Sequence, residues 1–272
     1  MTNEEEKPTQ EALLGEIAGT LRTIRGWMTF LGIVVLLALI GGCIMATGAL
    51  GGTGSIVNSW PSASGAGISG LALSGGYLYH ADTVNRYVYV TTTRGSIARS
   101  FRLPLYVNAV DFTLDVTSLW ACNTAGYVYR LNPTTGIING SWRTPEAGCG
   151  IAYGGGQIWC ASPTRIYRYT VTGSLFGTVS SGGRDLAGLE YADGYLWAVD
   201  RRTWRICQLT EGGSFISSIQ RPPGIYGVTR TSDAGPAYIW YTDQATRWVY
   251  HITAGYTPVA PASLGKVKAL YR

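Results

Sequence analysis

Groups that commonly bind metals or perform catalysis are scarce in this sequence of 272 residues. It holds only two histidines, and its five cysteines include no Cys-x-x-Cys pair, so a zinc site of the usual spacing is not expected. Paired carboxylates, a nucleophile elbow and a phosphate-binding loop are also missing. We therefore expect neither a metal ion nor another cofactor. The remaining candidates for acid–base chemistry are Asp111, Asp115, Glu146, Glu190 and His80.

Charge is also sparse, because Asp, Glu, Lys and Arg together make up only 14% of the residues. From residue 48 onward, 16 Arg and 2 Lys face 11 acidic residues, which leaves a positive surplus. Such a surface favours anionic partners such as acidic glycans or lipid headgroups. The arginines are scattered singly along the chain and do not form a basic cluster, so we do not expect nucleic acid as a partner.

Charge is absent from one long segment, Trp27 to Thr47, whose 21 residues are enough to cross a bilayer as a helix. Arg22 and Arg25 precede it, and no Lys or Arg follows before Arg86. By the positive-inside rule, this pattern predicts a single-pass anchor with its N-terminus in the cytoplasm. Residues 1–26 then form a cytoplasmic segment with an amphipathic helix, residues 48–53 a linker, and residues 54–272 a domain outside the cytoplasm.

The same segment allows a second interpretation. The stretch from Ile40 to Cys43 resembles a bacterial lipobox, in which the signal is cleaved after residue 42 and Cys43 carries lipid. The long, helically patterned N-terminal region favours an uncleaved anchor. Both interpretations place the following domain on the same side of the membrane.

Beyond Leu50 the chain repeats with a period near 40 residues. One aromatic position recurs at intervals of 41, 39, 38 and 43 residues. We call it the aromatic slot, and its members are Tyr79, Trp120, Trp159, Trp197 and Trp240. Each repeat shows four short strands separated by glycine-rich turns, which is typical of a propeller blade. The slot alternates with small residues in mid-strand, so we expect its rings between blades in preference to a role as carbohydrate platforms.

The ends of the repeat region predict how the ring closes. The segment Gly54 to Trp60 matches a fourth strand, Gly95 to Phe101, and stands before the first complete repeat. It is therefore expected to complete the last blade. We predict an all-β fold, a five-bladed β-propeller of four-stranded antiparallel blades, preceded by an N-terminal transmembrane α-helix. Lys266 to Arg272 resembles a further strand, either a tail strand or a contact with a neighbouring subunit.

The repeats resemble known propeller families. Gly70-Leu-Ala-Leu and Ala81-Asp-Thr-Val-Asn-Arg86 are similar to NHL and SMP-30-like repeats. Gly188-Leu-Glu-Tyr-Ala-Asp-Gly-Tyr-Leu-Trp197 is similar to repeats of glutaminyl cyclotransferase-like propellers and of secreted bacterial surface proteins. The resemblance covers residues 54 to about 254. It implies a fold and leaves the activity open, since propellers host many functions.

Two sets of charged residues are candidates for ligand binding. A patch of five residues falls in neighbouring turns that a propeller places on one face, and we predict that it binds an anionic ligand: Arg184, Asp185, Asp200, Arg201 and Arg202. The alternative is a solvated rim. Asp82 with Arg86, and Asp243 with Arg247, stand four residues apart across a turn, where we expect hairpin-stabilising ion pairs worth about 0–1 kcal/mol.

Cys149 and Cys160 are predicted to form a disulfide. If Gly154 and Gly155 form the tip of a two-residue hairpin, Tyr153 pairs with Gly156 and Cys149 lies opposite Cys160. Directly opposed residues are nearly close enough for a disulfide, and an extracytoplasmic location permits oxidation. The alternative is two reduced, buried cysteines.

Two functions remain open. The anchor, the propeller and the lack of a catalytic constellation favour a non-enzymatic binding or surface-assembly module, with a protein or anionic glycan on the propeller rim and self-association as expected partnerships. The family resemblance alone implies the alternative, an extracytoplasmic enzyme of the glutaminyl cyclotransferase or lyase type. An enzyme would need Glu190, Asp111 and His80 to converge in a pocket.

Overall fold

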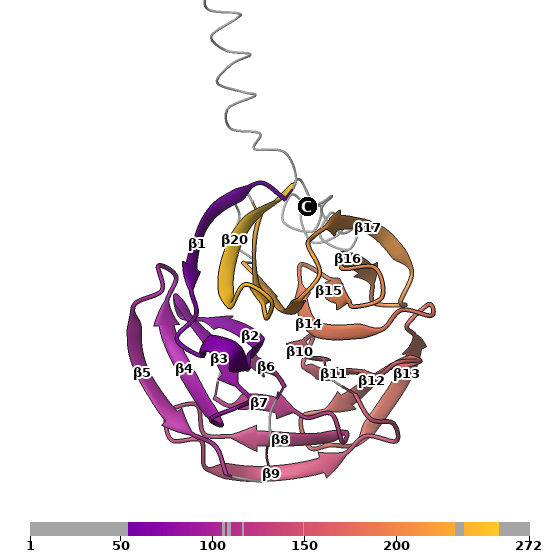
Figure 1. The fold of residues 1–272 in the computed structure, drawn as a ribbon. Helices are drawn as coiled ribbons and strands as arrows, with labels where there is room; N and C mark the ends of the chain where they lie inside the picture. Colours follow the sequence, from indigo (N-terminus) through magenta and orange to yellow (C-terminus); the bar gives the residue numbers. More distant parts are fainter. Residues whose placement is uncertain are drawn as a thin grey trace, which may run out of the picture. The chain divides into compact units, whose positions relative to one another are not determined.

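The computed structural model describes residues 54–104, 107, 110–115, 117–148, 150–231 and 237–255. These residues form five four-stranded antiparallel sheets arranged around a central axis (Figure 1). The predicted five-bladed propeller is therefore confirmed. The predicted anchor, Cys43, the linker and the tail strand lie outside the described residues. Within these ranges, no helix combines the length and the apolar character needed to cross a bilayer.

The strands follow one another from the axis outward in four of the blades. Blade 1 contains β2 (Ile68–Ser74), β3 (Tyr77–Asp82), β4 (Tyr87–Thr92) and β5 (Ile97–Arg102). Blade 2 contains β6 (Asp111–Leu114), β7 (Leu119–Cys122), β8 (Tyr127–Leu131) and β9 (Ile138–Arg143). Blade 3 contains β10 (Gly150–Gly154), β11 (Gln157–Ala161), β12 (Arg165–Thr170) and β13 (Leu175–Ser180). Blade 4 contains β14 (Leu186–Ala192), β15 (Tyr195–Asp200), β16 (Arg205–Thr210) and β17 (Phe215–Gln220).

Blade 5 joins the two ends of the propeller chain. It contains β18 (Ile225–Arg230), β19 (Ala237–Asp243), β20 (Trp248–Gly255) and, as its outer strand, β1 (Ile56–Pro61). Trp60 pairs with Val249, and the Gly54 amide donates to the Thr253 carbonyl at 2.7 Å. The N-terminal closure predicted from the unpaired fourth strand is confirmed.

The outer strands follow one another around the perimeter, and each begins against the end of the preceding one (Figure 1). Gly95, in the turn before β5, has a φ of +88°, and a Cβ there would lie 2.4 Å from the Trp60 ring at the end of β1. Glycine is needed here both for the backbone conformation and for the close approach. Four other turn glycines meet the preceding outer strand in the same way: Gly136, Gly173, Gly213 and Gly54.

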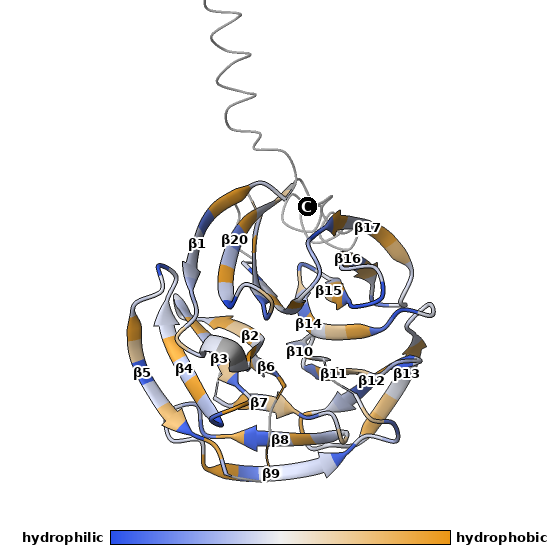
Figure 2. Ribbon diagram, in the orientation of Figure 1, coloured by the Kyte–Doolittle hydropathy of each residue, from blue (hydrophilic) through white to orange (hydrophobic). Residues whose placement is uncertain are grey.

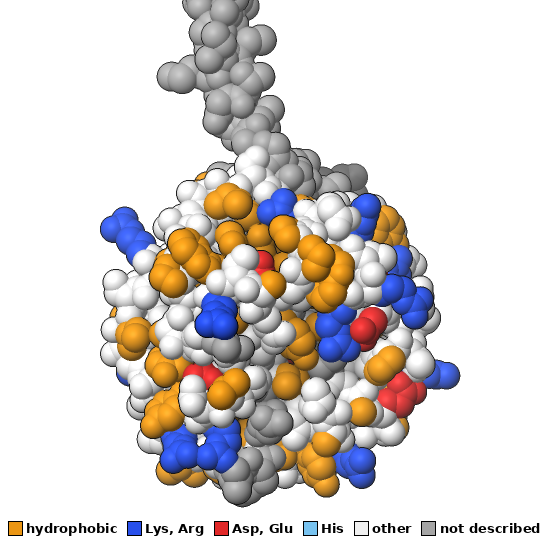
Figure 3. Space-filling view, viewed as in Figure 1, with side chains coloured by type: hydrophobic (Ala, Val, Ile, Leu, Met, Phe, Trp, Pro, Cys, Tyr) orange, Lys and Arg blue, Asp and Glu red, His pale blue; other side chains and the backbone are white. Residues whose placement is uncertain are grey.

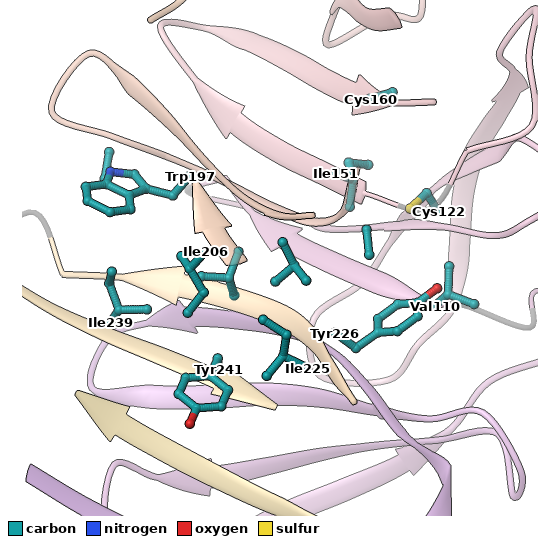
Figure 4. Packing of buried hydrophobic residues seen from close by; sticks show 14 of the residues in the cluster. Val110, Cys122, Ile151, Cys160, Trp197, Ile206, Ile225, Tyr226, Ile239 and Tyr241 are labelled. Carbon is teal, nitrogen blue, oxygen red and sulfur yellow. The ribbon is translucent and has the colours of Figure 1, made fainter. Parts of the chain in front are cut away.

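The core lies between the blades. The aromatic slot is buried in every blade, with exposures between 0% and 6%, so its predicted place between blades is confirmed. A second side chain packs on the ring of each slot residue. In four blades it is an arginine, and in blade 5 it is a histidine: Arg99 on Tyr79, Arg130 on Trp120, Arg168 on Trp159, Arg230 on Trp197 and His251 on Trp240. One apolar cluster joins residues of blades 2 to 5, several of which Figure 4 labels. In Figure 2, hydrophobic residues alternate with polar ones along several outer strands.

Because neighbouring strands are antiparallel, the turns fall on two faces. Each turn between third and fourth strands lies at the perimeter, against the end of the preceding outer strand. The turns between first and second strands share one face. We call it the N-terminal face. The turns between second and third strands share the opposite face with the links from blade to blade. We call it the connection face.

The turn between β10 and β11 differs from the predicted one. Gly154 pairs with Gln157, and Gly155 and Gly156 form the tip with φ values of +60° and +75°. The hairpin is thus shifted by one residue, and Ile151 lies opposite Cys160. The register argument for a Cys149–Cys160 disulfide was wrong. Cys160 is a buried free thiol, and Cys149 lies outside the described residues.

Candidate functional site: the propeller axis and the charged patch

The first strands of the five blades bring one equivalent position to the axis. Four blades have glycine there, and blade 2 has Asp111. The glycines are Gly70, Gly150, Gly188 and Gly227. A Cβ at Gly150 would lie 1.9 Å from the Ala187 carbonyl oxygen of blade 4, and a Cβ at Gly70 would lie 2.2 Å from the Cα of Asp111. The first strands therefore pack too closely for any larger residue at the four glycine positions.

Asp111 links several blades through its carboxylate. Oδ2 accepts hydrogen bonds from the amides of Ile151 at 2.9 Å and Leu189 at 3.1 Å, and Oδ1 accepts one from Leu71 at 3.4 Å. These donors belong to blades 3, 4 and 1. Burial raises the pKa of Asp111 well above its ordinary value, and the amide bonds oppose this shift only in part. Asp111 is fully buried and occupied by backbone donors, which indicates a role in joining the blades.

Glu190 lies two residues beyond the glycine position of blade 4. Its Oε2 accepts a hydrogen bond from the Thr229 hydroxyl of blade 5 at 2.6 Å, and its Oε1 accepts one from the Tyr191 amide at 3.0 Å. Burial raises the pKa of Glu190 to about 7, while the bond from Thr229 and the charge of Arg230 lower it. The carboxyl is therefore able to exchange a proton near neutral pH.

This pKa makes the stability of the protein depend on pH. Glu190 has an ordinary pKa of 4.5, so between pH 4.5 and about 7 the folded state binds more protons there than the unfolded state. We expect the free energy of unfolding to fall as the pH rises through this window, by at most about 3 kcal/mol, and to level off above it. Urea unfolding of the native protein and of Glu190→Gln at several pH values checks this. Groups shared by both proteins cancel in the comparison, and a difference that is constant with pH would contradict the assignment.

His80 has different hydrogen-bond partners from these two acids. Its Nδ1 is 2.8 Å from the Ser64 hydroxyl and 3.4 Å from that of Ser62, both in the link that leads into blade 1. Burial lowers the pKa of His80 to about 4, so the ring is neutral at physiological pH. Asp111 binds amides, Glu190 binds Thr229 and His80 lies beside two serine hydroxyls, so no hydrogen bond joins these three groups to one another.

The two other acid–base candidates stabilise loops. Asp115 accepts hydrogen bonds from the Trp120 indole at 2.8 Å and from the amides of Thr117 and Ser118 at 2.6 Å each. Glu146 accepts bonds from the hydroxyls of Ser162 at 2.6 Å and Thr164 at 2.7 Å, and these bonds lower its pKa. Both carboxylates are thus held in local hydrogen-bond networks.

The five residues of the predicted charged patch do lie together on the connection face. Arg201 forms an ion pair with Asp185 at 2.7 Å, and the amides of Asp185 and Arg202 donate to Asp200 at 3.3 and 3.1 Å. Arg184 donates to the Ser181 carbonyl at 3.1 Å. Asp200 is buried, whereas Arg202 is exposed. The acids therefore organise the turns and pair with one arginine, while Arg202 and part of Arg184 face solvent.

Figure 3 shows one side of the propeller, on which Lys and Arg side chains are spread among hydrophobic ones. They do not merge into one basic patch, which agrees with the scattered arginines of the sequence. A ligand on this surface would therefore meet local groups of charge and not a broad basic field.

Ion pairs were predicted across the turn between second and third strands, Asp82 with Arg86 and Asp243 with Arg247. They are not formed in the described part of the chain. The Asp82 carboxylate accepts bonds from the amides of Val84 and Asn85 at 3.1 and 2.9 Å, and Asp243 binds the amides of Ala245 and Thr246 in the same way. The carboxylates cap these turns instead. Arg86 and Arg247 end the two turns with positive φ values of 61° and 65°. The prediction of side-chain pairs was wrong because backbone amides are the nearer donors.

A small pocket lies between blades 2 and 3 near the connection face. Its lining includes Cys122, Asn123, Cys160, Ser162 and Tyr167, and its free volume is about 10 Å³. This is roughly the room that one water molecule needs. Burial raises the pKa of the Cys160 thiol, so this group is unreactive at neutral pH. The pocket is too small for an organic substrate.

Comparisons with known proteins extend only to the fold. No protein-family model and no curated protein matches the chain. Glutaminyl cyclase from Myxococcus xanthus superposes with a TM-score of 0.62 at 17% identity, over 72% of this chain and 94% of that one. A streptogramin B lyase superposes with a TM-score of 0.46 at 16% identity, over 75% of this chain and 74% of that one. The resemblance to glutaminyl cyclotransferase-like propellers is thus confirmed as a likeness of fold.

Sequence reasoning missed the axial ring and the contacts of Glu190 with Thr229 and Arg230. A signal for the ring was present. A glycine stands nine residues before the aromatic slot in three repeats, at Gly70, Gly150 and Gly188, and Asp111 stands at this spacing in blade 2. In blade 5 the spacing is longer, and Gly227 stands 13 residues before Trp240. Nothing in the pattern indicated that Arg230 lies over Trp197 of the preceding blade and pairs with Asp193.

Proposed function

We propose that this protein is a membrane-anchored, non-enzymatic binding module displayed outside the cytoplasm, and that its connection face binds an anionic ligand such as an acidic glycan. The observation that carries the proposal is the dispersal of Asp111, Glu190 and His80 into three separate hydrogen-bond networks. The positive surplus of the domain and the uncharged segment at residues 27–47 support the ligand class and the anchor.

The charged patch supplies the expected binding groups. Arg202 is exposed and is the main cation that an anion can reach. Arg184 is half-buried in the neighbouring link, where it donates to the Ser181 carbonyl and lies over the Phe215 ring. Arg201 is held by Asp185 and contributes less. We expect Arg184→Ala/Arg202→Ala to weaken binding of a heparin fragment, used as a sulfated-glycan probe, by about tenfold.

This binding is measured by calorimetry on the full-length chain in lipid vesicles. The matched control is Arg94→Ala/Arg102→Ala, which removes the same charge from blade 1 and should change the affinity less than about twofold. Equal losses in both variants would show that the probe responds to overall charge, and unchanged binding in the patch variant would contradict the assigned surface.

A second candidate is favoured by one observation. The Glu190 carboxyl titrates near pH 7, as a general acid or base would. The alternative function is therefore an enzyme of the cyclotransferase or lyase type that uses Glu190. Conversion of an N-terminal glutaminyl peptide by the native protein, lost in a Glu190→Gln variant that is still folded at the assay pH, would establish this alternative and refute the binding-only function.

A further inference from the structure

The outer strand of every blade contains a β-bulge at its second residue. Pairing with the neighbouring strand shifts register there, so this residue has no partner in the ladder. The bulge residues are Val57, Ala98, Asn139, Phe176 and Ile216. All five are exposed, and four of them are apolar. The fold therefore presents one side chain per blade at the perimeter, and blade 2 alone presents an amide there.

Each bulge is followed, two residues later, by a serine or threonine. In four blades this residue returns to the ladder opposite a tyrosine of the third strand. The five residues are Ser59, Ser100, Ser141, Thr178 and Ser218. Asparagine, any residue except proline, and then serine or threonine form the acceptor sequence for N-linked glycans. The repeat completes this sequence once, at Asn139-Gly140-Ser141.

The three residues of this triplet are accessible at the surface. Asn139, Gly140 and Ser141 are all exposed, and a Cβ at Gly140 would meet no atom within 4 Å. In the part of the chain that the structure describes, neither the Asn139 side-chain amide nor the Ser141 hydroxyl forms a hydrogen bond. They belong to β9, the outermost strand of its sheet, so no further strand of that sheet covers them. The fold does not use the two groups that a modifying enzyme recognises.

A second asparagine of blade 2 provides an internal comparison. Asn132 is followed by Pro133 and Thr134, and proline at the middle position excludes this triplet as an acceptor. The Asn132 side chain also has a structural role, because its Oδ1 accepts hydrogen bonds from the amides of Thr134 and Thr135 at 2.9 and 3.0 Å. Asn132 is thus held in a turn, whereas Asn139 is not.

We propose that Asn139 is an acceptor for an N-linked glycan that is transferred from a polyprenyl diphosphate carrier. The Nδ2 atom forms a bond to C1 of the first sugar and loses one proton. The bond between C1 and the diphosphate oxygen breaks, and the diphosphate leaves with the electron pair. This inference rests on the display outside the cytoplasm in the proposed function, because N-linked glycans are carried by secreted and surface-exposed domains.

The test uses the full-length chain, purified from the membranes of eukaryotic cells that glycosylate secreted proteins. Trypsin cleavage after Arg130 and Arg143 releases one peptide that contains both Asn132 and Asn139. Electron-transfer fragmentation leaves a glycan on its residue, so mass spectrometry distinguishes the two asparagines. We expect a glycan at Asn139 and none at Asn132, and complete loss of the glycan in Ser141→Ala. An unmodified Asn139 would overturn the inference.

Blade 1 supplies the matched control. Ala98→Asn completes the same triplet with Arg99 and Ser100 at the equivalent bulge, so it should add a second glycan to the chain. A glycan at position 98 alone would show that the propeller is displayed and that Asn139 is not an acceptor.

If neither position is modified, protease added to sealed microsomes separates the two remaining outcomes. Digestion of the propeller would place it on the cytoplasmic side, so the display in the proposed function fails and the acceptor site fails with it. Protection of the propeller would leave the display standing and overturn the acceptor site alone.

Discussion

Replacement of Asp111 by alanine is expected to lower the free energy of unfolding by about 3–5 kcal/mol. The carboxylate accepts bonds from the buried amides of Leu71, Ile151 and Leu189, at 3.4, 2.9 and 3.1 Å. Each buried donor left without an acceptor costs about 1–3 kcal/mol. These amides belong to three other blades, so the substitution weakens the joining of the ring as a whole.

Asp111→Asn is the matched control for this experiment. Asparagine keeps a carbonyl oxygen that accepts hydrogen bonds and has no charge to bury, so we expect its loss to be less than half that of Asp111→Ala. Urea unfolding followed by tryptophan fluorescence measures both. Equal losses in the two variants would mean that the bonds to the axis amides contribute little, and that filling the axial space matters more.

The sequence predicted the architecture because its signals are local and repeated. The aromatic slot recurs at nearly constant spacing, and the strand before the first blade matches Gly95 to Phe101. Blade number, strand order and closure between β1 and β20 followed from these patterns. Packing of the slot between blades also followed, because buried rings alternate with small residues along strands.

The wrong predictions concern places where a shift of one residue changes the strand register, or where two kinds of hydrogen-bond donor compete for one carboxylate. A shift of one residue in the Gly154-Gly155-Gly156 turn placed Ile151, not Cys149, opposite Cys160. Three consecutive glycines allow either tip, so the sequence cannot choose between them. At Asp82, the choice between Arg86 and the backbone amides depends on turn geometry that spacing alone does not contain.

The position of the charged patch could be predicted from the sequence, but the pairing of its acids with its arginines could not. The repeat period correctly predicted that Arg184 and Arg201 lie in neighbouring turns of one face. Which acids neutralise which arginines depends on side-chain directions, and the structure shows that Asp185 holds Arg201 while Asp200 binds backbone amides. Anion binding by this patch remains a prediction.

Replacement of Gly150 by alanine is expected to lower the free energy of unfolding strongly. The new Cβ would lie 1.9 Å from the carbonyl oxygen of Ala187 in the first strand of blade 4. A backbone carbonyl in a packed strand cannot turn aside as a flexible side chain can, so the two blades must separate. Overpacking usually costs about 1–3 kcal/mol, and at this contact we expect at least about 3 kcal/mol.

Gly177→Ala provides the matched control, because a Cβ at Gly177 in β13 meets no atom within 4 Å and its φ is not positive. Alanine there loses less conformational freedom on folding than glycine does, so stability should stay within about 1 kcal/mol or rise slightly. Urea unfolding compares the two variants, and if Gly150→Ala does not fold, its loss from the soluble fraction beside a soluble Gly177→Ala gives the same answer. Equal stability of both variants would show that the first strands can move apart at the axis, which would contradict the close packing that places Asp111 within reach of three other blades.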